Sequence, residues 1–512
     1  MQFGDYSGGG DGPGFGINGG GGGGGASAGD AYEDYGGGGS STQYVQHEEE
    51  HHPVVELILP GTHGGSGSSA KRAFFNIVCF TTGAGTFGIS YALKNMGWGG
   101  MFVIALAALA SWYTGVLLHR CHQFSGVNID QVLRTGLIVG DVDQRGNGAA
   151  RGYEDIAKNA FGAEARRAVV WITYINQVGV SILYLILAGN NMLLLTNPTG
   201  TTPVFPSSSR IGDSTDSDLR LWIVCFSVLL LPLVCRRELR HIAVTSMIGV
   251  FCLLLSVTCV IGEAVAAPGA LEDHDYGGVT LDSFIRGLAT SVFAFSGHPV
   301  YPVVQSSMAQ PSRFPAVLSG VYAFLFAVLG SVAAAGYYSY GAKTLPNVLR
   351  DLAPGGVTSF TILLTTAHLY LAIPVVLQPA IMALEKRFVT VEQERVVAIS
   401  CGKTVYARKH QVVQTACRVV LVLVAAGFSV AVPFFGDVMS LLGATTVTLF
   451  AIVLPALMYS NLFWEKMSDM EKGICGLLLL GGFFIFVGGT LSAMSNIVKK
   501  SKDWVWFHHE KQ

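Results

Sequence analysis

The sequence contains few charged residues for its length. Asp, Glu, Lys and Arg make up 13% of its 512 residues, whereas soluble domains average about 25%. Half of the residues are apolar, and apolar runs of roughly 20 residues recur, the length that crosses a bilayer core of about 30 Å. The sequence therefore predicts a multi-pass protein of the lipid bilayer. Its net charge of −2 gives no reason to expect nucleic acid as a partner.

Signals for metals, disulfides and catalysis are also missing. The nine cysteines form no CxxC pair and no Cys/His ligand spacing, so we interpret them as small packing residues. The run from His47 to His52 is interpreted as a solvated charged segment. No loop combines a nucleophile, a base and an orienting group. We therefore expect no cofactor, no metal and no enzymatic activity.

The chain divides into a Gly-rich tail, an apolar domain and a short end. Residues 1–70 contain almost no aliphatic clusters and are predicted to be a disordered cytoplasmic tail, without the pattern of a cleaved signal peptide. Residues 71–496 are predicted to form a transmembrane domain, and 497–512 a C-terminal tail. Lipid cannot hydrogen-bond the backbone, so the spans must be helices. Eleven are predicted, at 73–94, 98–119, 168–195, 219–235, 241–267, 283–309, 314–340, 357–385, 412–432, 438–462 and 473–496.

The distribution of basic residues predicts the orientation. Most of the 32 Lys and Arg residues fall on the inner side if the N-terminus is cytoplasmic, as the positive-inside rule requires. The longest inner loop, 120–167, contains a segment at 153–162 in which Ile156, Ala160 and Phe161 recur at helical spacing. We expect a short amphipathic helix there, which either takes part in gating or is a plain surface helix.

Two predicted spans contain strong helix breakers. The first holds Gly83, Gly85 and Gly88 within six residues, and Gly costs about 1 kcal/mol relative to Ala inside a helix. Its GxGxxG spacing has no preceding strand, which excludes a dinucleotide site. The sixth holds Gly297, His298 and Pro299, and Pro removes a backbone donor. We expect both helices to unwind at these points.

The two breaks lie five helices apart. Two inverted repeats of five helices place the first and sixth spans in corresponding positions, which is typical of transporters with broken helices. Half-helix ends offer N–H groups to a carboxylate and C=O groups to a cation. The predicted fold is therefore an all-α membrane protein of about 11 helices with a 5+5 inverted-repeat core and broken helices 1 and 6. The alternative is that the glycines serve close helix packing.

Several segments resemble one known family. The sequence is similar to the amino acid/auxin permease family, and in particular to its vacuolar amino acid transporter branch, over nearly all of 71–495. This resemblance implies a secondary active amino acid transporter, often coupled to protons. The poly-Gly tail and the 196–218 loop depart from the family pattern. The similar segments are 83–88, 92–97 (ALKNMG), 153–162, 297–302 (GHPVYP), 307–308, 314–315, 370–385 and 433–441 (PFFGDVMSL).

The two breaks supply the expected substrate site. Backbone groups at Gly83, Ala84, Gly85 and Thr86 are predicted to hold the substrate carboxylate. Carbonyls at Ser296 and Gly297 are predicted to accept from its ammonium group. Phe295, beside Phe293, is either part of a side-chain pocket or a packing residue. Tyr174 and Gln177 either face the site from the third span or are packing groups.

The coupling ion is left open. His298 lies inside the second break, and a reference pKa of about 6.5 suits it to bind and release protons; alternatively its ring caps a freed backbone group. Thr365 and Thr366 lie where a sodium ion is held in transporters of this architecture, or else they bond to their own helix. Protons are the expected coupling ion and sodium is the alternative.

A sensor that binds an amino acid in the same fold and signals through its tail is the competing function. A sensor needs a docking segment, and Gly repeats are poor docking segments, so transport is favoured. The resemblance favours the vacuole or another endomembrane, with the plasma membrane as the alternative.

Overall fold

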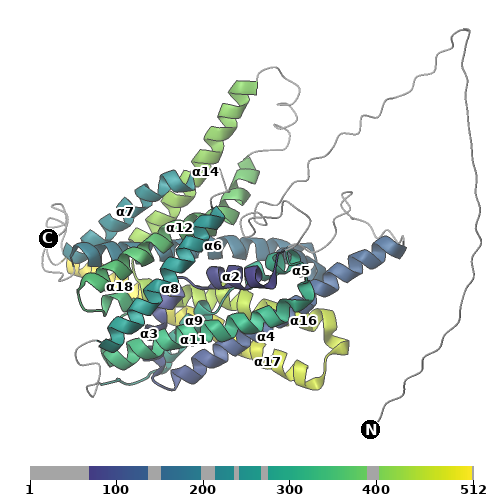
Figure 1. The fold of residues 1–512 in the computed structure, drawn as a ribbon, viewed down its shortest axis with the longest axis horizontal. Coiled ribbons are helices and arrows are strands. Elements are labelled where there is room, and N and C mark those ends of the chain that lie inside the picture. The colour runs from purple at the N-terminus through teal and green to yellow at the C-terminus, as the bar shows by residue number, and fades with distance from the viewer. Residues whose placement is uncertain are drawn as a thin grey trace, which may run out of the picture. The chain divides into compact units, whose positions relative to one another are not determined.

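The computed structural model describes residues 68–135, 152–197, 214–235, 242–266, 275–388 and 403–509. Within these ranges all regular elements are helices, and they pack as a bundle of long helices (Figure 1). The predicted tail lies outside the described residues up to residue 67, as does most of the 196–218 loop.

The described helices account for all the predicted spans. Nine are long and apolar enough to cross a membrane, and the bent pair α2 and α3 forms a tenth span. The eleventh is the sixth span, whose halves α9 and α10 are each too short to qualify alone. The helices are α2 (Ala70–Thr81), α3 (Ala84–Met96), α4 (Gly100–Thr135), α6 (Ala163–Thr196), α7 (Ser214–Val234), α8 (Ile242–Ala266), α9 (Leu281–Ala294), α10 (Tyr301–Ser306), α11 (Phe314–Tyr340), α12 (Gly356–Phe388), α14 (Lys403–Ala431), α15 (Phe435–Leu442), α16 (Leu454–Phe463), α17 (Asp469–Phe484) and α18 (Thr490–His509).

Helix packing follows the expected repeat. α3 of the first span packs against α9 of the sixth, and α4 of the second packs against α11 of the seventh. In the same way α6 of the third span packs against α12 of the eighth, and α7 of the fourth against α14 of the ninth. Each of these four spans thus contacts the span five positions later, as two interlocked repeats of five helices require.

The first span is interrupted between Thr81 and Ala84, where its two halves bend by 60°. The side chains of Thr81 and Thr82 donate to the carbonyls of Ile77 and Val78 at 2.8 and 2.7 Å, which caps the end of α2. Gly83 is required by close packing, because a Cβ there would collide with the hydroxyl of Tyr184.

The sixth span is interrupted from Phe295 to Val300. α9 ends at Ala294, a single 3₁₀ turn begins at His298, and Pro299 falls in that turn, where its missing N–H costs least. The Tyr322 hydroxyl on α11 donates to the carbonyl of Phe295 at 3.0 Å. Side chains of a neighbouring helix therefore satisfy backbone groups that the break sets free.

The predicted short helix exists as α5 (Tyr153–Phe161). Its buried face consists of Tyr153, Ile156 and Ala157, whereas Phe161 is 45% exposed, so the predicted apolar face was wrong in its last member. The Tyr153 hydroxyl donates at 3.0 Å to the carbonyl of Phe450, within the π-helical segment Leu449–Val453 of the tenth span. α5 thus packs against the end of the bundle where α16 lies.

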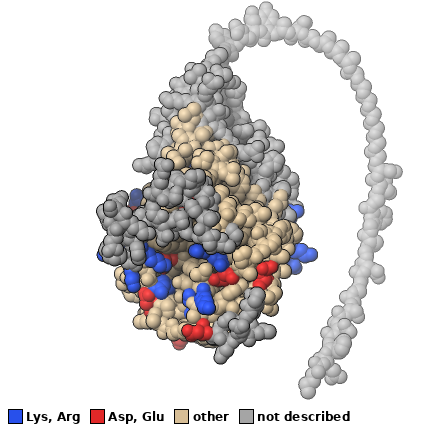
Figure 2. Space-filling view, turned by 90° about the vertical axis from the view of Figure 1, so that its left-hand side faces the viewer, with Lys and Arg blue, Asp and Glu red and all other residues tan. Residues whose placement is uncertain are grey.

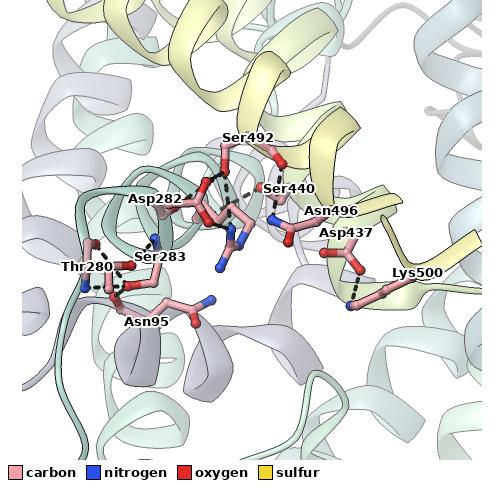
Figure 3. A network of polar contacts seen from close by, with 10 residues as sticks. Asn95, Thr280, Asp282, Ser283, Asp437, Ser440, Ser492, Asn496 and Lys500 are labelled. Atoms are coloured by element: carbon pink, nitrogen blue, oxygen red, sulfur yellow. Dashed lines mark hydrogen bonds and ion pairs between the residues drawn. The ribbon is translucent and has the colours of Figure 1, made fainter. Parts of the chain in front are cut away.

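At the opposite end, polar side chains tie α9 to the tenth and eleventh spans (Figure 3). Asp282 pairs with Arg286 and accepts from Ser492 on α18. Lys500 on α18 pairs with Asp437 on α15. Figure 2 shows basic and acidic side chains mixed at this end of the bundle. We call these contacts the α9–α18 network; they hold α9 against α15 and α18.

The segment between α11 and α12 contains a carboxyl group that is sensitive to pH. Both carboxylate oxygens of Asp351 accept from the Leu345 N–H at 3.1 Å. Burial is the largest influence and raises the pKa of Asp351 from 3.8 to about 7, although Lys94 and Arg350 oppose it. The folded protein therefore binds this proton more tightly than the unfolded chain.

We expect the stabilising effect of this proton to be complete below about pH 4 and to be lost as the pH rises through 7. Asp351→Asn keeps an acceptor for the Leu345 N–H and removes the charge. The difference in unfolding free energy between this variant and the wild type should grow in favour of the variant by about 2 kcal/mol from pH 5 to pH 8, allowing for the partial exposure of Asp351. Thermal unfolding in detergent measures the difference, with the fully exposed Asp469→Asn as the control. A difference between variant and wild type that does not change with pH would contradict the assignment.

Candidate functional site

A cavity of about 50 Å³ lies between the two interruptions. The first and sixth spans form two of its sides, and α6, α12 and the π-helical part of the tenth span form the rest. Its lining residues are Phe80, Thr81, Gly83, Ala84, Gly85, Asn176, Gln177, Val180, Tyr184, Phe293, Ser296, Pro299, Val376 and Val447.

The start of α3 presents backbone donors to this cavity. Gly83, Ala84 and Gly85 line it, and the first N–H groups of a helix have no partner within the helix. The Thr86 N–H, in contrast, donates to the Gly83 carbonyl at 3.0 Å. Three of the four predicted residues thus reach the cavity, and Thr86 does not line it.

Gly85 also sets the distance between the two broken helices. A Cβ at this position would lie 2.9 Å from the Cα of Ala294 and 3.3 Å from the ring of Phe293. The glycine is therefore needed for close packing of α3 and α9, in addition to any role in binding. Both explanations of these glycines, helix packing and a binding site, apply at this position.

The second break contributes Ser296 and Pro299 to the lining. Gly297 lies just behind them, where a Cβ would come within 2.5 Å of the Thr81 hydroxyl oxygen. Phe293 lines the cavity, whereas Phe295 is fully buried away from it. Of the two interpretations of Phe295, its position favours packing, and Phe293 takes the place next to the cavity.

The third span supplies the polar wall. Gln177 lines the cavity as predicted, together with Asn176 and Tyr184. Asn176 accepts from the Thr446 hydroxyl at 2.7 Å, which fixes its amide against the tenth span. The hydroxyl of Tyr184 lies in hydrogen-bonding reach of the Ala84 N–H. Tyr174 does not line the cavity; its ring contacts Trp171, which is 67% exposed.

Thr365 and Thr366 lie at another level of the membrane. On α12 the cavity is reached by Val376, about 15 Å further along the helix. Thr366 donates to its own helix at Ile362, 2.8 Å away, and accepts from Asn191. Thr365 is fully buried and its hydroxyl has no partner among the described residues. Neither threonine approaches the break in the first span.

His298 faces α4 and does not line the cavity. Its Nε2 lies 3.1 Å from the Ser111 carbonyl and 3.0 Å from the Thr114 hydroxyl. A carbonyl can only accept, so Nε2 carries the proton. The ring therefore links the break to a carbonyl of the uninterrupted α4, and not to a freed backbone group of its own broken helix.

This geometry gives His298→Gln a defined outcome. A Gln amide nitrogen reaches the position of Nε2, so the bond to the Ser111 carbonyl can persist without a titrating group, whereas Asn is too short. If His298 only holds the break against α4, His298→Gln should retain transport and the pH dependence of transport. His298→Ala should then lose about 1–3 kcal/mol of stability. Uptake against pH, with thermal unfolding of both variants, measures this. If uptake by His298→Gln no longer depended on pH, His298 would be the group that binds and releases the coupling proton.

The cavity is neutral. Among the described residues, its lining contains no Asp, Glu, Lys, Arg or His side chain. Beside the polar groups of the third span, the lining includes the apolar side chains of Phe80, Val180, Val376 and Val447. The site therefore suits a ligand whose own charges meet backbone groups and whose remaining part is uncharged.

Several lining residues were missed from the sequence. Asn176 and Tyr184 lie in a helix with many apolar residues, and no pattern separates the face toward the cavity from the face toward lipid. Val376 and Val447 are indistinguishable by sequence from ordinary membrane residues. One signal was present: Tyr184 follows Gln177 by two helical turns, which places both on one face.

The fold and the cavity define a helical membrane protein of the broken-helix class, with one site between two interrupted spans. The sequence pattern of the family described as "Transmembrane amino acid transporter protein" matches residues 66–498. The chain belongs to this family.

Among its relatives are two proteins of Arabidopsis thaliana. Amino acid transporter AVT1D is 27% identical over 88% of this chain and 73% of the relative. Amino acid transporter AVT3B is 26% identical over 85% of this chain and 95% of the relative. A solved structure, MhsT in complex with L-phenylalanine, is similar over 84% of this chain and 100% of that chain, with 13% identity and a TM-score of 0.45.

Proposed function

We propose that this protein is a secondary active transporter of neutral amino acids that works by alternating access. The observation that carries the proposal is the uncharged cavity between two interrupted helices, lined by Gly83, Ala84 and Gly85 at the first break and by Ser296 and Pro299 at the second. Membership of a family of amino acid transporters supports it.

The two ends of an amino acid match the two breaks. Its carboxylate binds at the start of α3, at the N–H groups of Gly83, Ala84 and Gly85, where the helix dipole favours negative charge. Tyr184 lies beside these groups and donates its hydroxyl proton to the carboxylate. The ammonium group meets the carbonyl of Ser296, where α9 has ended. Gly297 lies outside the lining, and its carbonyl accepts from the Val300 N–H at 3.2 Å.

The remaining walls select the side chain. Phe80, Val180 and Phe293 favour apolar groups, and the amides of Asn176 and Gln177 accept polar neutral ones. A charged side chain finds no partner in the lining and pays the cost of burial. The cavity is far smaller than pockets for drug-sized ligands, which favours small amino acids.

Alternating access requires each end of the bundle to open in turn. The α9–α18 network closes one end and must break when that end opens. At the other end, α5 contacts the tenth span through Tyr153 and must move away. We assign 71–496 as the transporter domain between two tails, with the N-terminus cytoplasmic and the protein in a vacuolar or other endomembrane.

Uptake of a panel of labelled L-amino acids into proteoliposomes tests this proposal. We expect accumulation of small neutral amino acids under an imposed pH gradient, without a requirement for sodium. Accumulation that depends on a sodium gradient would establish the alternative coupling ion. Saturable binding without flux of any amino acid would establish a sensor and contradict the proposal.

A further inference from the structure

The eighth span carries two buried polar atoms that the substrate site does not use. Both Nε2 of His368 and the hydroxyl of Thr365 lack a hydrogen-bond partner among the described residues. Their residues are 3% and 0% exposed, respectively. Residues three apart share one face of a helix, so the two residues are neighbours on α12. A buried polar atom without a partner calls for an explanation, such as a bound proton, water or ion; Nδ1 of His298 is another such atom, but on α12 two of them share one face.

His368 is held in a fixed orientation by the fifth span. Its Nδ1 lies 2.8 Å from the carbonyl of Gly249 on α8. Since the carbonyl accepts, Nδ1 carries the proton, and Nε2 is left with a free lone pair. Gly249 allows this approach, because a Cβ there would lie only 3.2 Å from Nδ1.

Among the residues whose surroundings the structure describes, no other charged side chain lies at this level of the bundle. α12 packs against α6, α7, α8 and α14. Two residues beyond His368, Tyr370 donates to the Leu229 carbonyl of α7, and Leu229 is about 16 Å along that helix from Asp218. Glu263 on α8 is bonded to Thr358, about 15 Å from His368 along α12. The charged side chains of these five helices with described surroundings lie near helix ends, except Arg418: Glu164, Arg166 and Arg167 on α6, Asp218 and Arg220 on α7, Glu263 on α8 and Glu385 on α12. Arg418 lies in the middle of α14 and pairs with Glu385, about 25 Å from His368 along α12. The other titratable groups on these faces are thiols and phenols: Tyr174, Tyr184, Cys225, Cys252, Cys259, Tyr370 and Cys417.

We propose that His368 and Thr365 form the site at which the binding of a proton is coupled to amino acid transport. This proposal rests on the proposed transport function. Nε2 takes a proton from hydronium and leaves water, and the Thr365 hydroxyl accepts from the resulting N–H directly or through that water. A hard cation such as sodium binds sets of oxygen ligands, and an imidazole beside one hydroxyl does not provide one. The same helix lines the substrate cavity at Val376, about 12 Å away.

The position of His368 also explains how its protonation can change the packing of the helices. His368 connects α12 to α8, the last helix of the first repeat, through the bond to Gly249. Protonation gives Nε2 a donor that must find an acceptor, which favours a different packing of these two helices. The substrate, bound beside Val376, and the proton, bound at His368, then both influence the packing of α12.

His368→Asn tests the proposal, because its amide nitrogen takes the place of Nδ1 and keeps the bond to Gly249. In proteoliposomes containing a pH-sensitive dye, we expect this variant to lose proton flux and pH-driven accumulation of labelled neutral amino acids. Exchange of labelled for unlabelled amino acid, without a gradient, should persist within about threefold of wild type. Wild-type uptake in the same assay tests the transport function itself, so the two failures are distinguishable.

Thr365→Val tests the second member of the site. We expect the pH of half-maximal uptake to fall by about one unit, since a net hydrogen bond changes proton affinity roughly tenfold. Thr361→Val is the matched control, because that buried hydroxyl donates to Val357 of its own helix at 2.8 Å, and its pH profile should not move. Proton-driven accumulation at the wild-type level in His368→Asn would overturn the proposal. So would a parallel loss of exchange, accumulation and thermal stability, which indicates a structural role alone.

Discussion

Replacing Gly85 with Leu should reduce amino acid transport by at least about 100-fold while the protein still inserts and folds. The added side chain enters the lining of the cavity, where Gly85 lies beside the proposed carboxylate position. It also meets the backbone of Ala294, 2.9 Å from the nearest Cβ position, so α3 and α9 must separate. Overpacking of this kind costs about 1–3 kcal/mol, which reduces stability without preventing folding. Uptake per correctly folded molecule is the measurement.

The chain offers matched controls for this substitution. A Cβ at Gly427 or at Gly481 meets nothing within 4 Å, so Gly427→Leu and Gly481→Leu add the same side chain to a membrane helix without touching the site. Both should transport as wild type. If Gly85→Leu also transported normally, the assignment of the first break to the substrate would be wrong.

Replacing Arg418 with Met should cost about 3–5 kcal/mol of unfolding free energy. Arg418 and Glu385 have side chains only 8% and 13% exposed, and the guanidinium Nε donates to the carboxylate at 2.9 Å. Arg418 also donates to the carbonyl of Val234, so it joins the fourth, eighth and ninth spans. Removing the cation leaves a buried carboxylate without its partner. Thermal unfolding in detergent measures the loss, and uptake per folded molecule should change little because neither residue lines the cavity.

Two further variants separate burial from charge. Arg167 and Glu164 form an ion pair whose side chains are 69% and 82% exposed, so Arg167→Met should cost less than about 1 kcal/mol. The double variant Arg418→Met with Glu385→Leu removes both buried charges and should recover most of the lost stability. Equal losses in Arg418→Met and Arg167→Met would show that burial is not the cause.

The sequence predicted the architecture well because two physical rules leave little freedom. Lipid forces each apolar segment into a helix, and residues such as Gly83 and Pro299 mark where a helix cannot continue. Four of the first five spans then pack against the span five positions later, in agreement with the repeat that the two breaks predict. The residues beside the breaks, Gly83, Ala84, Gly85 and Ser296, were predicted for the same reason, and all four line the cavity.

The walls of the cavity were harder to predict. A membrane helix is apolar all round, so periodicity does not separate the cavity face from the lipid face, and Tyr174 was chosen where Tyr184 lies at the site. The roles of His298 and Thr365 depend on what the opposite helix presents. His298 and His368 each place one ring nitrogen on a carbonyl of another helix and leave the other without a partner among the described residues, and His368 carried no sequence signal.

The most direct test of the central claim is an experimental structure of the protein with a transported amino acid bound. We predict that the amino acid lies between the two interruptions, with its carboxylate at the N–H groups of Ala84 and Gly85 and its ammonium group at the carbonyl of Ser296. A bound amino acid outside this cavity, or one bound in the reverse orientation, would contradict the account.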